Sequence, residues 1–164
     1  MITLLDIYNI IEENGIVIDE VKFVYKNMIG AYIKYPGLPP IIGINKKILK
    51  DEKTLLSILA EELGHHFTSM GDLTVECITY SEKLEKSKQE LKARTWAANF
   101  LISDFDLAQA INKSISPSIG ELAEYFRVTH EIIECKLRSV LFSKTRFNYI
   151  TNQLMEGIYD SCNI

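Results

Sequence analysis

Residues 58–67 read Ile-Leu-Ala-Glu-Glu-Leu-Gly-His-His-Phe, and this stretch decides how the rest of the chain is interpreted. Its centre, from Glu61 to His65, differs by one letter from H-E-x-x-H, which places two metal-binding His residues four positions apart with a catalytic Glu after the first. Glu61 occupies the position of the first His. The stretch is therefore either a metal site with an altered ligand set or a relic that no longer binds metal.

Helical spacing supports the first interpretation. At about 100° per residue, Glu61 and His65 lie about 40° apart on a helix, so both side chains can reach one ion. Glu62 lies beside them, where it can take a proton from a water molecule without binding the ion. A Lewis acid and a neighbouring carboxylate are what a metal hydrolase needs. In the other register His66 pairs with Glu62, but an apolar Leu63 then takes the position of the base.

His66 is instead predicted to be a neighbour of the site: a donor behind the ligands, a substrate contact or a partly buried structural residue. A simpler interpretation of the whole stretch is a solvated pair of Glu followed by two surface His. The apolar residues on most sides of the helix argue against it, because buried carboxylates need a partner or an ion. These residues are Ile58, Leu59, Ala60, Leu63 and Phe67.

A third carboxylate follows at Glu90. Ala93, Ala97 and Leu101 continue the same helical face, and small residues there allow a close approach to another helix. Glu90 could then project toward Glu61 and His65 and complete three protein ligands, with the fourth position open for water, as in catalytic zinc sites. Taken alone, Glu90 has the appearance of a surface charge.

The remaining secondary structure falls into an early mixed part and a later helical part. A helix is expected over 3–13, and short β-branched runs predict strands at 16–18, 21–25, 28–35 and 41–44. Helices are expected over 52–68, 88–102 and 104–112, while 72–86 stays unassigned. Ser118 and Glu121 form a possible capping box that opens a helix to Phe126, and a turn at 127–129 leads to a helix over 130–142. The last two helices look like a helix-turn-helix, and 144–164 is weakly patterned.

Length and composition exclude several classes of protein. The chain has 164 residues, of which 47% are hydrophobic, and this suits one compact domain with a small appended part. A net charge of -4 argues against a main role in binding nucleic acid. Three cysteines without a C-x-x-C pair are read as free thiols in a reducing cytoplasm. The beginning of the chain does not resemble a secretory signal, and no apolar run approaches 18 residues, so no membrane is expected.

Three segments in order resemble the ImmA/IrrE family of metallopeptidases (domain of unknown function 955) over roughly residues 15–142. The first is the stretch that ends in Glu61-Glu-Leu-Gly-His65. The second is Glu90-x-x-Ala-x-x-Trp-Ala-x-x-Phe-Leu-Ile102, and the third is Glu121-Leu-Ala-Glu-Tyr-Phe-Arg-Val-Thr129. The chain departs from the family pattern at Glu61, where His is usual, and at Ser103, where Pro is common.

The resemblance implies an α+β fold, with a minimal zincin-like domain over 1–103, a helical helix-turn-helix-like module over 104–142 and a C-terminal tail over 143–164. It maps the first ligand to Glu61, the general base to Glu62, the second ligand to His65 and the third to Glu90. The cofactor is expected to be Zn²⁺, and the second carboxylate also makes Mn²⁺ or Fe²⁺ suitable. Members from phages and mobile elements act as anti-repressors, which cleave or otherwise inactivate a helix-turn-helix repressor.

Three hypotheses about function follow. The first is a cytoplasmic, site-specific metalloprotease acting on such a repressor of a prophage or mobile element. Its substrate would pair with a sheet edge near the motif helix, for which Ile41–Asn45 is the candidate, with Ile42 and Ile44 in contact with substrate; the alternative is an ordinary internal strand. The second is a module that binds a repressor and cuts nothing. The third is a DNA-binding regulator, disfavoured because Glu131 and Glu134 begin the second helix of the helix-turn-helix unit.

Overall fold

The computed structural model describes residues 1–69, 80–113 and 117–162, and within these it is an α+β protein with one three-stranded sheet and seven α-helices. The chain divides into two compact units, residues 2–97 and residues 98–164 with Met1, and the division falls inside helix α3 (Tyr80–Leu101). Helix α3 starts eight residues before the predicted helix 88–102. The prediction missed these residues because the first two turns of α3 are polar and carry no apolar period.

The first unit begins with helix α1 (Leu4–Glu13), which Thr3 and Asp6 cap reciprocally, and it ends before Gly15 at a φ of +62°. The sheet follows with strands β1 (Val17–Val21), β2 (Gly30–Ile33) and β3 (Ile41–Asn45). Their order is β1-β3-β2, so β3 is the central strand, parallel to β1 and antiparallel to β2.

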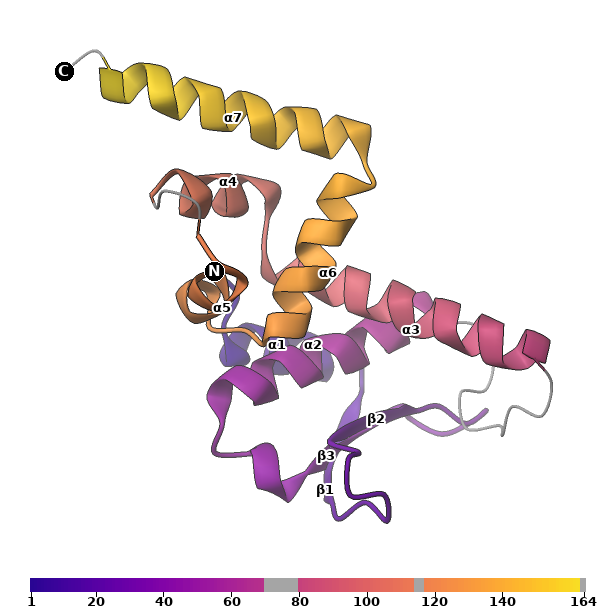
Figure 1. Ribbon diagram of the computed structural model, residues 1–164. Helices are drawn as coiled ribbons and strands as arrows, with labels where there is room; N and C mark the ends of the chain where they lie inside the picture. Colours follow the sequence, from indigo (N-terminus) through magenta and orange to yellow (C-terminus); the bar gives the residue numbers. More distant parts are fainter. Residues whose placement is uncertain (70–79, 114–116, 163–164) are drawn as a thin grey trace. The chain divides into compact units, whose positions relative to one another are not determined.

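A short 3₁₀ turn, η1 (Lys46–Ile48), leads from β3 to helix α2 (Glu52–Thr68), and α1 and α2 cover one face of the sheet (Figure 1). Asp51 caps α2 by accepting from the backbone N–H of Thr54 at 3.2 Å. The hydrophobic core of this unit lies between the helices and the sheet, and its most buried members are Ile7, Ile11, Ile42, Ile44, Leu59 and Leu63.

One predicted strand was wrong. Of the predicted strand 21–25 only Val21 lies in the sheet, at the end of β1; residues 24–25 form a bend, and Val24 is 93% exposed. Their β-branched and aromatic composition favours a strand, but a strand also needs a partner, and β3 already has neighbours on both sides.

The second unit is helical throughout its described residues. It contains α4 (Asp104–Asn112), α5 (Ile119–Phe126), α6 (His130–Leu141) and α7 (Lys144–Cys162). The capping box of Ser118 and Glu121 is confirmed, and so is the helix-turn-helix-like succession of α5 and α6. The weakly patterned end of the chain is not irregular, because most of it forms α7, which packs on α4 and α6.

A polar network holds α4, α6 and α7 together. Lys136 is 1% exposed, and its ammonium group donates to Asp104 at 2.7 Å and to Asn99 at 3.2 Å. Arg146 donates through Nε to the second oxygen of Asp104 at 2.7 Å. These two cations hold the pKa of Asp104 down at about 2, with the hydrogen bond from Arg146 as the largest cause. One carboxylate therefore ties together three helices.

Candidate metal centre

The motif lies on the buried part of α2. Glu61 and His65 are one turn apart, and the side chains of His65 and Glu61 are 7% and 17% exposed. Glu62 is more deeply buried than Glu61. The prediction that this helix is buried on most sides is therefore confirmed.

Helices α2 and α3 approach each other closely enough for their backbones to touch. A Cβ atom built on Gly64 would lie 2.3 Å from the carbonyl oxygen of Ala93, so only glycine fits at this position. Ala93 and Ala97 are fully buried, as expected for a helix face of small residues. Glu90 precedes Ala93 by three residues and thus lies on the same face of α3, toward α2.

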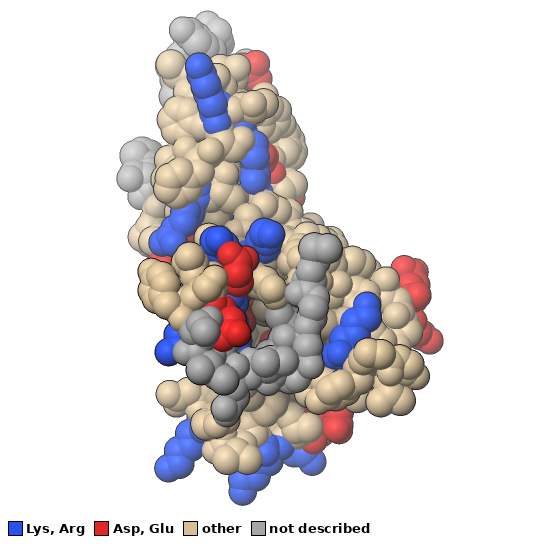
Figure 2. Space-filling view, turned by 90° about the vertical axis from the view of Figure 1, so that its right-hand side faces the viewer, with Lys and Arg blue, Asp and Glu red and all other residues tan. Residues whose placement is uncertain are grey.

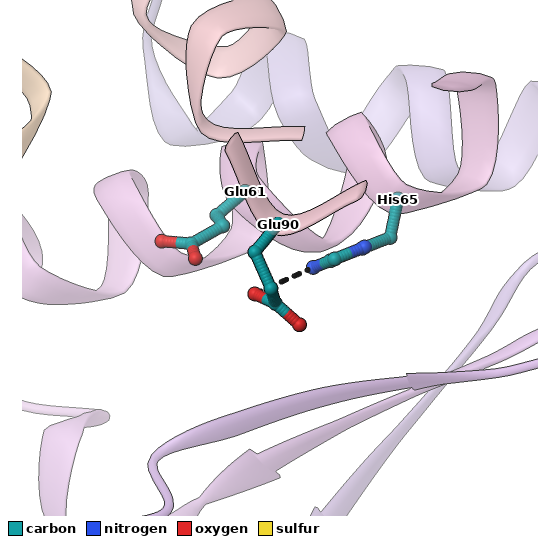
Figure 3. Close-up of side chains that lie close together, drawn as sticks. All are labelled: Glu61, His65 and Glu90. Carbon is teal, nitrogen blue, oxygen red and sulfur yellow. Dashed lines mark ion pairs between the residues drawn. The ribbon is translucent and has the colours of Figure 1, made fainter. Parts of the chain in front are cut away.

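The structure brings Glu61, His65 and Glu90 together. One potential ligand atom from each lies within 4.8 Å of the other two, and no other such group of three is found among the described residues. The Nε2 atom of His65 is 3.5 Å from Oε2 of Glu90, and Figure 3 shows the imidazole pointing at that carboxylate. Two ligand atoms of a tetrahedral zinc ion are about 3.3–3.5 Å apart, because each is about 2.0–2.2 Å from the metal. The His65–Glu90 pair is already at that spacing.

Ser69 orients the imidazole. Its hydroxyl oxygen is 3.1 Å from Nδ1 of His65, at the end of α2. The tautomer decides what Nε2 does: with a proton on Nε2 it donates to Glu90, whereas with Nδ1–H donating to Ser69 the lone pair of Nε2 faces the Glu90 carboxylate, so that two acceptors lie opposite each other. A cation between them stabilises this arrangement, and a hydrogen bond on the far nitrogen is the usual companion of a His ligand. The donor set of one imidazole and two carboxylates thus fits a divalent ion.

Glu62 lies beside this group in a different environment. Burial, and then the charges of Glu61 and Glu90, raise its pKa to about 8. Its carboxylate accepts a hydrogen bond from the backbone N–H of Tyr32 on β2, and it lies so close to β2 that a Cβ on Gly30 would be 2.5 Å from one of its oxygens. Gly30 therefore makes room for a carboxylate whose pKa lies close to neutral pH, as is typical of a general base.

Arg94 contacts the first residue of the motif. Its Nε atom donates to Oε1 of Glu61 at 2.7 Å. Arg94 is one turn beyond Glu90 on α3, and it helps to lower the pKa of Glu90, for which a hydrogen bond from His65 is the largest cause. In Figure 3 the Glu61 side chain extends from α2 on the side away from His65.

His66 lies outside the group of three. Its Nδ1 atom is 2.9 Å from the hydroxyl oxygen of Tyr32, and its ring meets that of Phe67 edge to face, while Phe67 stacks on Trp96. Burial lowers the pKa of His66. Of the roles proposed from the sequence, this geometry describes a partly buried residue that joins α2 to β2, and its contact with substrate stays a prediction.

The expected substrate edge at Ile41–Asn45 was wrong. β3 is the central strand, so its backbone N–H and C=O groups already pair with β1 and β2, and Ile42 and Ile44 are 0% and 1% exposed. A central strand cannot accept a further strand, and side chains buried in the core cannot touch a substrate. The edge strand next to α2 is β2.

Sequence reasoning missed Ser69 and Arg94. Both follow a proposed ligand by four residues, Ser69 after His65 and Arg94 after Glu90. Residues four apart are neighbours on a helix, so a scan for polar residues at this spacing from each ligand would have found them.

The chain also matches a known protein family. The family model described as the IrrE N-terminal-like domain, of the M78 peptidases, matches residues 11–138. That match includes Glu61, Glu62, His65 and Glu90. No curated protein and no solved structure matches the chain. Among the described residues, none of the helices is both long and apolar enough to span a membrane.

Proposed function

The chain belongs to the IrrE N-terminal-like family of metallopeptidases, and from this premise we propose that it is a metal-dependent endopeptidase. The ligands are Glu61, His65 and Glu90, and the general base is Glu62. The observation that carries the proposal is the 3.5 Å approach of the His65 and Glu90 ligand atoms, with Glu61 and a buried Glu62 beside them.

The cofactor is a divalent ion. Zn²⁺ binds both imidazole nitrogen and carboxylate oxygen, and two carboxylates beside one imidazole also suit Mn²⁺ or Fe²⁺. When bound, such an ion supplies Lewis acidity, which lowers the pKa of a water molecule and polarises a carbonyl group. Glu62 accepts the proton that the water loses and delivers it to the leaving amine.

The substrate is held at the outer edge of β2. The backbone N–H of Asn45 donates to the carbonyl of Ile29, so residues 29, 31 and 33 pair with β3 and the backbone groups of Gly30 and Tyr32 point away from it. The Tyr32 N–H meets Glu62 on that side. A peptide that adds to this edge lies beside the general base, in the manner of strand addition.

The protein substrate is a helix-turn-helix repressor of a prophage or mobile element, which the enzyme inactivates in the cytoplasm. This assignment follows the resemblance of the chain to anti-repressors of the same family. A role in binding DNA is disfavoured by α6, because Lys136 is buried against Asp104 and only Arg138 stays exposed among acidic residues. On the face of the protein that Figure 2 draws, Lys and Arg side chains alternate with acidic and other residues.

Two measurements test the proposal. Protein purified without added metal should contain about one equivalent of a divalent ion, and the His65→Ala variant should lose it. Repressors of the helix-turn-helix class from the same genome should be cleaved by the wild type, and a chelator should abolish cleavage. The Glu62→Gln variant should keep the metal and cut nothing, whereas Glu12→Gln, an exposed carboxylate on α1, should behave as wild type.

Two results would contradict the proposal, one for the metal centre and the other for the peptidase activity. A wild-type protein free of metal refutes the metal centre. Metal binding with a Glu62→Gln variant that still inactivates the repressor in cells refutes the peptidase and favours a module that only binds its partner.

A further inference from the structure

Arg94 is a half-exposed residue that pairs with a more buried one. Its side chain is 48% exposed, whereas that of its partner Glu61 is 17% exposed. The pair of Lys88 and Glu85 on the same helix is different, since both of its side chains are more than half exposed. Exposed pairs of the second kind contribute little to stability, so the first kind needs a separate explanation.

The contact leaves Glu61 able to bind metal. Arg94 donates through Nε to one oxygen of Glu61, Oε1, at 2.7 Å. A carboxylate has a second oxygen, so an ion could bind Oε2 while Oε1 accepts from Arg94. A carboxylate ligand whose second oxygen accepts a hydrogen bond is fixed in orientation, just as a His ligand is fixed by a hydrogen bond on its far nitrogen.

The net charge of the site also favours a cationic side chain beside Glu61. A centre with two His and one carboxylate as ligands, a divalent ion and a catalytic Glu has a net charge of zero. Replacing one neutral His by Glu61 adds a negative charge to a group that already contains Glu62 and Glu90. Arg94 returns that group to zero, and its guanidinium group contacts the added carboxylate directly, with Nε 2.7 Å from Oε1 of Glu61.

We propose that Arg94 is a positioning residue of the metal centre, which fixes Glu61 as a ligand and offsets its charge. Glu61 and Arg94 together then take the place of the missing His. This inference rests on the metal centre proposed above. It predicts that Arg94 helps metal binding only when residue 61 is a carboxylate.

Four proteins test this dependence: the wild type, Arg94→Ala, Glu61→His and the double variant. Their affinity for Zn²⁺ is measured by competition with a chromophoric chelator, and circular dichroism checks that each is folded. In the wild-type background, Arg94→Ala should weaken Zn²⁺ binding about 10-fold or more, the usual effect of losing a residue that orients a ligand. In the Glu61→His background, the same change should leave the affinity unchanged or raise it, because an uncompensated Arg repels the ion.

Two further variants control the experiment. Lys88→Ala removes a cation from the same helix whose partner is the exposed Glu85, and it should not alter the affinity for Zn²⁺. Arg94→Lys keeps the charge without the fixed Nε–H donor. It should lose less affinity than Arg94→Ala, and it replaces that variant in the comparison if Arg94→Ala does not fold.

The outcomes separate this inference from the metal centre itself. An equal loss in both backgrounds means that Arg94 acts only on the fold, and a tighter wild-type site after Arg94→Ala means that Arg94 opposes the ion. Either result overturns the inference and leaves the metal centre standing. A wild-type protein that binds no Zn²⁺, Mn²⁺ or Fe²⁺ overturns both.

Discussion

A Cβ atom on Gly64 would lie 2.3 Å from the carbonyl oxygen of Ala93, so α2 and α3 touch through their backbones beside the proposed metal centre. In an ordinary helix Gly64→Ala would stabilise the protein by about 1 kcal/mol. Here the methyl group forces the helices apart, and we expect a net loss of about 1–3 kcal/mol in the free energy of unfolding. Urea unfolding measures it, together with a weaker affinity for Zn²⁺.

Gly120→Ala on α5 is the matched control for this change. The nearest atoms to its added Cβ are 3.8 Å away, which is an ordinary contact. This variant should be as stable as the wild type or slightly more stable. If Gly64→Ala were also neutral, the close approach of the two helices would not govern the site.

Ser69→Ala removes the partner of the His65 Nδ1 atom. The backbone N–H of residue 69 still donates to the His65 carbonyl, so the end of α2 stays intact. We expect the affinity for Zn²⁺ to fall about 10-fold, with little change in stability. Ser87→Ala, whose hydroxyl donates to a backbone carbonyl on the exposed face of α3, should leave the affinity unchanged. A wild-type affinity in Ser69→Ala would show that His65 is oriented by packing alone.

Glu62→Gln should stabilise the metal-free protein. Burial, and then the charges of Glu61 and Glu90, raise the pKa of Glu62 to about 8, so its ionised form destabilises the metal-free protein. Gln has the same shape and can still accept the hydrogen bond from Tyr32. In the presence of a chelator at pH 8, we expect the free energy of unfolding to rise by about 1–2 kcal/mol. A variant less stable than the wild type would mean that the charge of Glu62 supports the fold.

Acid should weaken the helical unit through Asp104. Its pKa falls from 3.8 to about 2 on folding, so the folded state binds fewer protons than the unfolded state between these values. The stabilisation is complete above about pH 4 and is lost as the pH falls toward 2, and it amounts to about 2 kcal/mol. Unfolding by urea at a series of pH values between 2 and 7 measures this dependence.

Asp104→Asn tests the origin of that acid sensitivity. It should flatten the pH dependence, and at pH 7 it should cost about 3 kcal/mol, because Lys136 is then buried without a counter-charge. Asp106→Asn, two residues along, removes a carboxylate that accepts from Ser103 at the start of α4, and it should keep the acid dependence of the wild type. An unchanged profile in Asp104→Asn would assign the acid sensitivity to another group.

The features that could be predicted from the sequence are those that depend on the spacing of nearby residues. The motif helix, the capping box of Ser118 and Glu121 and the small-residue face of Ala93 and Ala97 are all set within one or two helical turns. The position of β3 was not predictable in this way, because strand order depends on partners distant in the chain. Arg94 and Ser69 had the right spacing, but their meaning appears only when α2 and α3 lie together. The first turns of α3 are polar and exposed, so they carry no apolar period to read, whereas α7 is recognised by its packing on α4 and α6.

The contact between Gly64 and Ala93 has a consequence for how such a site can change over evolutionary time. The atoms that set the distance between the ligand-bearing helices belong to the backbone, so the ligands themselves are not needed to hold the scaffold. An exchange of His for Glu at position 61, with a compensating cation at position 94, would therefore leave the spacing of these two helices unchanged.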